Sequence, residues 1–83
     1  MATNTYAQAW GDEIRSRRKL LNLSRVELAD MVGVTPTMVG FWEQGRHAPS
    51  SAMQATLIRN LGIDPVSIGK LILSGGDDPK AVA

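Results

Sequence analysis

The sequence contains no cysteine, a single histidine and only four aromatic side chains among its 83 residues. Without cysteine the chain forms no disulfide and offers no thiolate to a metal, and one histidine, His47, cannot by itself anchor a metal site. A glycine-rich phosphate loop is also missing, as is a pair of carboxylates placed beside a nucleophile. We therefore expect no catalytic residues, no metal, no cofactor and no small-molecule ligand, and an enzyme is the least favoured class of function.

Long apolar runs are absent as well, since no stretch approaches the roughly 18 residues needed to cross a bilayer. The first residues lack the basic start and apolar stretch of a signal peptide. We therefore expect no membrane partner and a cytoplasmic location. With 43% hydrophobic and 20% charged residues, the composition is that of one small globular domain.

The net charge of +1 is too small to indicate a nucleic-acid partner, but the charge is unevenly distributed. Residues 15–47 carry six basic and three acidic side chains, whereas residues 60–83 carry two basic and three acidic ones. This asymmetry predicts one positive face. A solvated surface of mixed charge is the alternative explanation of the same counts.

Residues 24–45 read as two short helices joined at Gly33. Ser24 is a good N-cap, and Glu27 three residues later completes a capping box, so the first helix begins at about residue 25. Its apolar residues fall on one face, and Gly33 then supplies the left-handed conformation that ends such a helix.

The second helix of this pair is predicted over residues 36–44. Thr35 is its N-cap, and Pro36 occupies the first helical position, where its missing N–H costs nothing. Val39 and Trp42, three residues apart, form its inward face, and Gly45 ends it. Two helices joined by a short turn containing glycine form a helix-turn-helix unit.

Apolar residues at helical spacing also predict helices over about residues 6–21, 51–61 and 65–74, the first of them with an inward stripe that includes Leu21. No alternating pattern is long enough for a strand. The expected fold is therefore all-α with five helices. We expect residues 6–74 to form the domain, with flexible ends over residues 1–5 and 75–83.

Twenty-two residues at characteristic spacings carry a family resemblance. They are Ile14, Arg15, Arg18, Leu23, Ser24, Glu27, Leu28, Ala29, Val32, Gly33, Val34, Thr35, Val39, Trp42, Glu43, Gly45, Arg46, Pro49, Leu57, Leu61, Gly62 and Ile63. With them, residues 10–74 resemble the lambda-repressor-like helix-turn-helix domains of phage repressors, Cro proteins and many bacterial regulators. The resemblance implies sequence-specific binding of double-stranded DNA by a small transcriptional regulator of phage or bacterial origin, most similar to a Cro protein or a small repressor.

The resemblance also implies an ion pair between Arg18 and Glu43, which ties the first helix to the end of the third. The spacing agrees, because Arg18 lies on the same stripe as Ile14 and an inward arginine needs an anion. An Arg18 that reaches solvent is the alternative.

The outward face of residues 36–44 is predicted to contact base edges in the major groove. The residues assigned to this contact are Pro36, Thr37, Met38, Gly40 and Phe41. Many relatives carry longer polar side chains on this face, so readout here should depend on thymine methyl groups, the Thr37 hydroxyl and groove shape. For Phe41 the alternative is a core or dimer residue, and for Gly40 it is a small residue that permits close approach.

Phosphate contacts are predicted from helix N-termini and from basic or polar side chains beside them. The residues assigned to them are Ser24, Arg25, Thr35, Gln44, Arg46 and His47. The first helix has other basic side chains that either contact DNA or keep the protein soluble, namely Arg15, Arg17 and Lys19. One such domain offers few base contacts, so we expect a homodimer bound to two operator half-sites. The expectation covers a dimer that forms in free solution and a dimer that forms only on DNA.

The apolar last turn of the fifth helix is the expected dimer surface, through Ile68, Leu71, Ile72 and Leu73, although some of these side chains must also cover the core. The rival to DNA binding is a protein-interaction module of the same fold, such as an antitoxin or an anti-repressor. The apolar outward face of residues 36–44 favours that rival, and the basic positions around it oppose it.

Overall fold

Five α-helices follow one another in the computed structural model, which describes residues 5–75, with side chains described as far as residue 70. The elements are α1 (Thr5–Leu20), α2 (Arg25–Val32), α3 (Pro36–Glu43), α4 (Ser51–Leu61) and α5 (Pro65–Gly75). The described residues contain no strand, which confirms the all-α prediction. No helix among them is long and apolar enough to cross a membrane. Of the ends expected to be flexible, residues 1–4 and 76–83 lie outside the described residues, whereas Thr5 and Gly75 belong to α1 and α5.

Local sequence signals set the ends of the helices where they were predicted. The Ser24 hydroxyl accepts a hydrogen bond from the Glu27 amide at 3.0 Å, and the Glu27 carboxylate accepts one from the Ser24 amide at 2.7 Å. This reciprocal pair is the predicted capping box. Gly33 ends α2 with a φ of 80°, a left-handed conformation that glycine adopts without strain. The Thr35 and Ser50 hydroxyls cap α3 and α4 in the same way as Ser24 caps α2.

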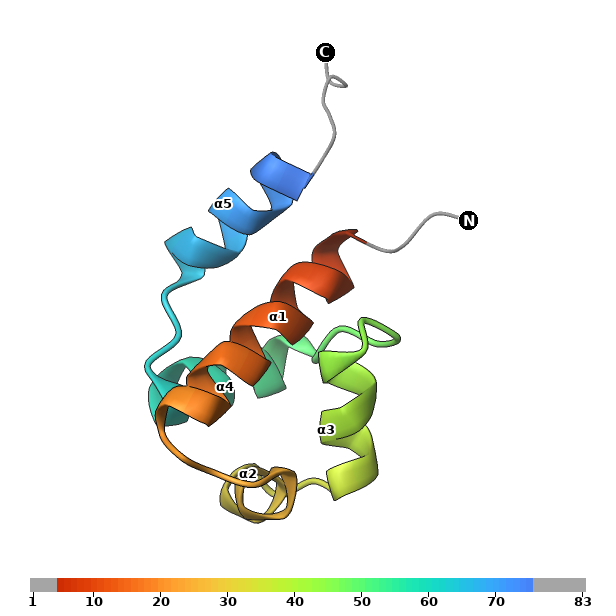
Figure 1. The fold of residues 1–83 in the computed structure, drawn as a ribbon, viewed down its shortest axis with the longest axis vertical. Coiled ribbons are helices and arrows are strands. Elements are labelled where there is room, and N and C mark those ends of the chain that lie inside the picture. Colours follow the sequence, from red (N-terminus) through yellow and green to blue (C-terminus); the bar gives the residue numbers. More distant parts are fainter. Residues whose placement is uncertain (1–4, 76–83) are drawn as a thin grey trace.

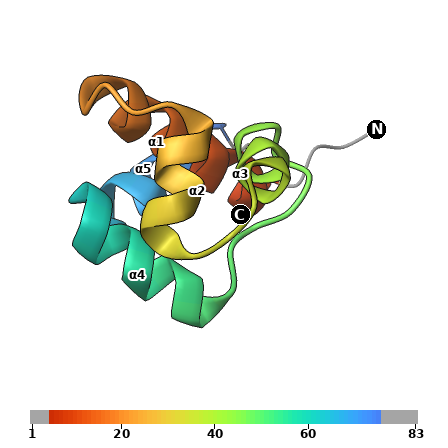
Figure 2. The same ribbon diagram turned by 90° about the horizontal axis from the view of Figure 1, so that it is seen from below.

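The helices pack around one hydrophobic core, to which all five contribute. Its largest fully buried side chains are Ile14, Leu28, Val39, Leu57 and Leu61. α1 lies between α5 on one side and α3 on the other (Figure 1). Seen from below, α2 lies between α3 and α4, so that the two helices of the helix-turn-helix unit form one end of the molecule (Figure 2). Because α5 packs on α1, it leaves the outward side of α3 open.

One residue predicted for the inward stripe of α1 lies outside the core. Leu21 is 44% exposed, because α1 ends at Leu20. The next residues form a turn in which Asn22 has a φ of 64° and the Leu23 amide donates to the Arg18 carbonyl. This turn redirects the chain before a further helical position could face inward.

α1 and α3 approach each other closely at Gly11, which is buried. A Cβ atom placed on Gly11 would lie only 2.1 Å from the Trp42 carbonyl oxygen. The obstacle is backbone, which cannot rotate away as a side chain does. Glycine is therefore required at this crossing, and the crossing fixes the position of α3 on the domain.

We expect Gly11→Ala to lower the free energy of unfolding by about 3 kcal/mol or more, at the upper end of the cost of overpacking. Gly69→Ala in α5 is the matched control, because its Cβ would meet no atom within 4 Å. That change should be neutral or stabilising by up to about 1 kcal/mol through helix propensity. Urea unfolding of both variants measures the difference, and equal stabilities would contradict the role given to Gly11.

Candidate nucleic-acid interface

α3 presents one buried face and one exposed face. Val39, Trp42 and Glu43 face the interior, as the sequence predicts for the first two. Pro36, Thr37 and Met38 are exposed, so the first turn of the helix is accessible to a partner. Their assignment to base contacts stays a prediction.

Two other residues assigned to base contacts are less accessible than expected. Gly40 is buried, although it lies on the side of α3 that faces open space, and its assignment to base contacts stays a prediction. It lacks a side chain, and the surrounding atoms cover most of its backbone, although a Cβ atom there would meet nothing within 4 Å. Phe41 is half-buried, because its ring packs on the chain that follows α3.

Glu43, the last residue of α3, has a carboxylate that is buried and held by Arg18 from α1. The Arg18 Nε atom lies 2.6 Å from Oε2 of Glu43, and a second nitrogen lies 3.1 Å from Oε1. The side chains are 12% and 1% exposed. Arg18 also donates to the Leu23 carbonyl oxygen at 2.9 Å. The ion pair implied by the family resemblance is thus present, in the two-pronged geometry that suits arginine and carboxylate.

A second arginine shares the same carboxylate, and sequence reasoning missed this contact. The Arg25 Nε atom lies 3.1 Å from Oε1 of Glu43, and the Arg25 side chain is 47% exposed. The signal in the sequence was indirect: a buried carboxylate has more acceptor positions than one arginine fills. About half of the Arg25 side chain is exposed while its Nε atom is bound to the buried carboxylate.

These contacts determine the ionisation of Glu43. Burial raises the pKa of the Glu43 carboxyl, but hydrogen bonds and charges from Arg18 and Arg25 lower it by more, so the net pKa is below its ordinary value. The hydrogen bond to Glu43 likewise raises the pKa of Arg18. Glu43 is therefore an anion at neutral pH, bound between two cations.

All six residues predicted to contact phosphate are exposed, namely Ser24, Arg25, Thr35, Gln44, Arg46 and His47. The hydroxyls of Ser24 and Thr35 already accept hydrogen bonds as helix caps. Each of these residues therefore marks a helix N-terminus, whose backbone amides are the groups available to a partner. Within the described residues, the amides of Arg25 and Val26 at the start of α2 have no acceptor. Free amides at a helix N-terminus favour an anion such as phosphate.

The chain leaves α3 through a tight turn that holds Arg46 beside the helix. The Gly45 amide donates to the Trp42 carbonyl and the Arg46 amide donates to the Phe41 carbonyl, at 3.0 Å and 2.9 Å. Gly45 has a φ of 75°. These features define a Schellman turn. Because Glu43, to which Arg25 is bound, lies only three residues before Arg46, both cations lie at the same end of α3.

Two basic side chains of α1 have partners that assign them to the fold. Arg17 donates through Nε to the Leu61 carbonyl oxygen at 2.9 Å, which satisfies the C-terminal end of α4. Arg15 pairs with Asp12 at 3.6 Å on the surface. Neither arginine is part of the cationic end of α3.

The expected dimer surface on α5 is corrected in part. Ile68 is only 5% exposed and belongs to the core, because α5 packs that side against α1. It is therefore not available for the contact assigned to it. The side chains of Leu71, Ile72 and Leu73 lie outside the described part of the chain.

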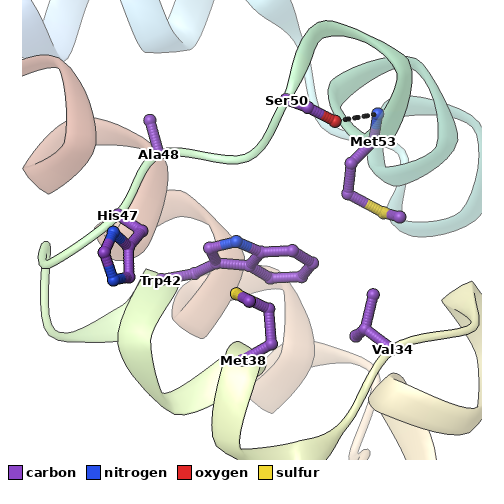
Figure 3. A pocket seen from close by; sticks show the side chains of 7 residues that line it. All are labelled: Val34, Met38, Trp42, His47, Ala48, Ser50 and Met53. Carbon is purple, nitrogen blue, oxygen red and sulfur yellow. Dashed lines mark hydrogen bonds between the residues drawn. The ribbon is translucent and has the colours of Figure 1, made fainter.

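An apolar pocket of about 360 Å³ opens beside α3. Figure 3 shows the Trp42 indole at its centre, with Met38 and Val34 from the helix-turn-helix unit and Met53 from α4 around it. His47, Ala48 and Ser50, from the chain between α3 and α4, complete the lining. The pocket adds apolar surface next to the exposed turn of α3.

We expect Arg18→Ala to lower the free energy of unfolding by about 3–5 kcal/mol, because it leaves the buried Glu43 carboxylate without its main partner. Arg25→Ala is the control: Glu43 stays paired with Arg18, and a half-exposed ion pair contributes less than about 1 kcal/mol. Chemical denaturation of both variants tests the difference. A loss for Arg18→Ala no larger than that for Arg25→Ala would contradict the arrangement.

A second prediction concerns acid. Because the pKa of Glu43 is lower in the folded than in the unfolded chain, the unfolded state takes up more protons, and stability decreases as the pH falls below about 4.3, the ordinary pKa of a glutamate. Glu43→Gln removes this component. The advantage of the natural chain over the variant should therefore shrink between about pH 5 and about pH 3. An advantage that is constant over this range would show that Glu43 titrates as an unperturbed carboxyl.

Comparison with known proteins identifies relatives of this arrangement. Over 49 residues the chain is 43% identical to a protein of Methanothermobacter thermautotrophicus named as an uncharacterized HTH-type transcriptional regulator, a match that covers 59% of this chain and 71% of the relative. Two crystal structures of the clp gene regulator ClgR from Corynebacterium glutamicum superpose with a TM-score of 0.74. They are 24% and 25% identical, and the matches cover 89% and 88% of this chain and 79% and 94% of theirs.

The structural likeness shows a shared fold, and the sequence match is more specific. The sequence profile of the helix-turn-helix family matches residues 14–68, a span that includes α2, α3, the Arg18–Glu43 pair and Arg46. This chain therefore belongs to the helix-turn-helix family.

Proposed function

We propose that this chain binds double-stranded DNA sequence-specifically, with α3 in the major groove, and acts as a small transcriptional regulator. The observation that carries this proposal is the exposed first turn of α3 together with two exposed arginines, Arg25 and Arg46, at its other end. A helix of this kind fits the width of the major groove, and the arginines are suited to the phosphates that border it. The relative named as an HTH-type transcriptional regulator supports the same activity.

Base readout by α3 would come mainly from Thr37 and Met38. Thr37 offers a hydroxyl that suits several base edges, and Met38 an apolar surface suited to the thymine methyl group. Both are exposed in the first turn, as readout requires. With few hydrogen-bonding groups on this face, sequence preference would also depend on groove shape.

Affinity would come mainly from phosphate contacts. Arg25 is held by Glu43 through one nitrogen and has further N–H groups for a phosphate. The unpaired amides at the start of α2 lie beside it and favour the same anion. Gln44, Arg46 and His47 are the candidates at the end of α3.

The regulator we propose is a Cro-like protein or small repressor that acts by occupying its operator, in a bacterial or phage-infected cytoplasm. It would bind as a homodimer on two half-sites, because a single domain of this size offers limited contact area. Binding, without catalysis, is the whole of the proposed activity.

One observation favours a second candidate, a protein-interaction module such as an antitoxin or an anti-repressor. The apolar pocket of about 360 Å³ continues the exposed surface of Met38 and is suited to an apolar side chain of another protein. The two candidates differ in their dependence on salt. Binding to DNA through about six phosphates weakens by orders of magnitude between about 50 mM and 200 mM salt, whereas binding in an apolar pocket does not.

We expect the chain to shift short DNA duplexes at about 50 mM salt and to bind far more weakly at about 200 mM. Arg46→Ala should weaken binding to all sequences alike and reduce the slope of log affinity against log salt by about one. Thr37→Ala should instead change preference at one base pair. The charge control is Arg59→Ala, which removes an exposed cation at the far end of α4 and should have little effect.

Selection of bound sequences from a random pool provides the panel for these variants. If Arg46→Ala and Thr37→Ala behave alike across it, the division between phosphate and base contacts is wrong. If the natural chain binds no duplex at about 50 mM salt, the second candidate function is favoured.

A further inference from the structure

We infer that Phe41 is a positioning residue for a phosphate clamp formed by Arg46 and His47, and that it does not read bases. The inference rests on the proposed function and deepens it. Phe41 lies on the face of α3 that the sequence predicts to contact base edges. In this chain its ring is engaged by Arg46 and His47, the third and fourth residues after α3.

The backbone brings these groups together. In a Schellman turn the amide of the second residue past the helix cap bonds to the carbonyl three positions before the cap, and the two side chains usually touch. Here those residues are Arg46 and Phe41, joined by the 2.9 Å hydrogen bond between their backbones. The hydrophobic contact that usually accompanies the turn is replaced by a cation over a ring.

The side-chain geometry follows from this turn. The Arg46 guanidinium carbon lies 5.4 Å from the centroid of the Phe41 ring, within the range of a cation–π interaction. The His47 ring meets the Phe41 ring in an edge-to-face arrangement, with centroids 5.3 Å apart and planes at 68°. One aromatic ring therefore holds both members of the clamp.

The turn is itself fixed to the domain. A Cβ atom on Gly45 would lie 2.5 Å from Oε1 of Gln8, so α1 packs directly against the turn. Gln8 is held in place by its donation to Asp12 at 3.0 Å. The clamp is thus anchored at its backbone by α1 and at its side chains by Phe41.

This arrangement leaves Arg46 ready for an anion. A cation–π contact involves the flat face of the guanidinium group, so the N–H groups of arginine can still donate hydrogen bonds. Among the described residues no carboxylate pairs with Arg46. An arginine that is already held in place loses less conformational freedom on binding, which increases affinity without a new contact.

The test is a double-mutant cycle between Phe41 and Arg46, measured as affinity for three unrelated short duplexes at about 50 mM salt. Phe41→Leu keeps an apolar side chain but removes the ring face. It should weaken binding about fivefold to all three duplexes in the natural background, the effect of a contact of this kind. In the Arg46→Ala background the same change should alter affinity less than about twofold.

Two controls separate positioning from folding and from base contact. Phe41→Tyr keeps the ring and should bind within about twofold of the natural chain. Met38 lies on the same helix and takes no part in the ring contacts with Arg46 and His47, so the effect of Met38→Leu should be additive with that of Arg46→Ala. An effect of Phe41→Leu that is equal in both backgrounds, or confined to one duplex, would overturn the inference while leaving DNA binding intact.

A readout without DNA keeps the inference open to test even if Phe41→Leu folds poorly. The Arg46 side-chain protons should show an upfield ring-current shift in the NMR spectrum of the natural chain, and this shift should persist in Phe41→Tyr. Unshifted Arg46 protons would overturn the positioning role alone. Failure of the natural chain to bind any duplex would instead overturn the proposed function and, with it, the clamp.

Discussion

The buried carboxylate of Glu43 is the point on which the structure depends, because three helices meet there. It ends α3, and it is held by Arg18 from α1 and by Arg25 from α2. A charge removed from water is costly unless it is paired and hydrogen-bonded, so each arginine offsets the burial of Glu43 only in one arrangement of the helices. Together with the close crossing at Gly11, this pairing sets how far α3 projects from the domain and in which direction.

The same carboxylate connects the core to the surface. Arg18 is nearly buried, whereas about half of the Arg25 side chain remains exposed, so one anion holds a structural arginine and orients a second for a partner. Arg46 is oriented differently, by a helix-ending turn and an aromatic ring. Both exposed cations are thus held at one end of α3 by contacts within the chain. They are in position before any DNA binds.

Sequence reasoning succeeded where a feature depends on neighbouring residues. The capping box of Ser24 and Glu27 and the turn at Gly33 are local, and the helix boundaries followed from such signals. The burial of Ile68 and the exposure of Leu21 depend on which helices pack where, and periodicity does not show that. The Arg18–Glu43 pair, 25 positions apart, was predicted because the family resemblance implies it, whereas the contact of Arg25 with Glu43, 18 positions apart, has no local signal and was missed.

The structure also bears on how selective such a regulator would be. In α3 the Phe41 ring is engaged by Arg46 and His47. Under the proposed function, α3 therefore reads bases mainly through its first turn, while the exposed arginines beside it bind the DNA backbone. Phosphate contacts are the same for every DNA sequence. A single domain would therefore bind DNA well but distinguish poorly between one sequence and another. Selectivity would then have to come from groove shape and from the spacing of two domains on one operator, since both add discrimination without adding base contacts to α3.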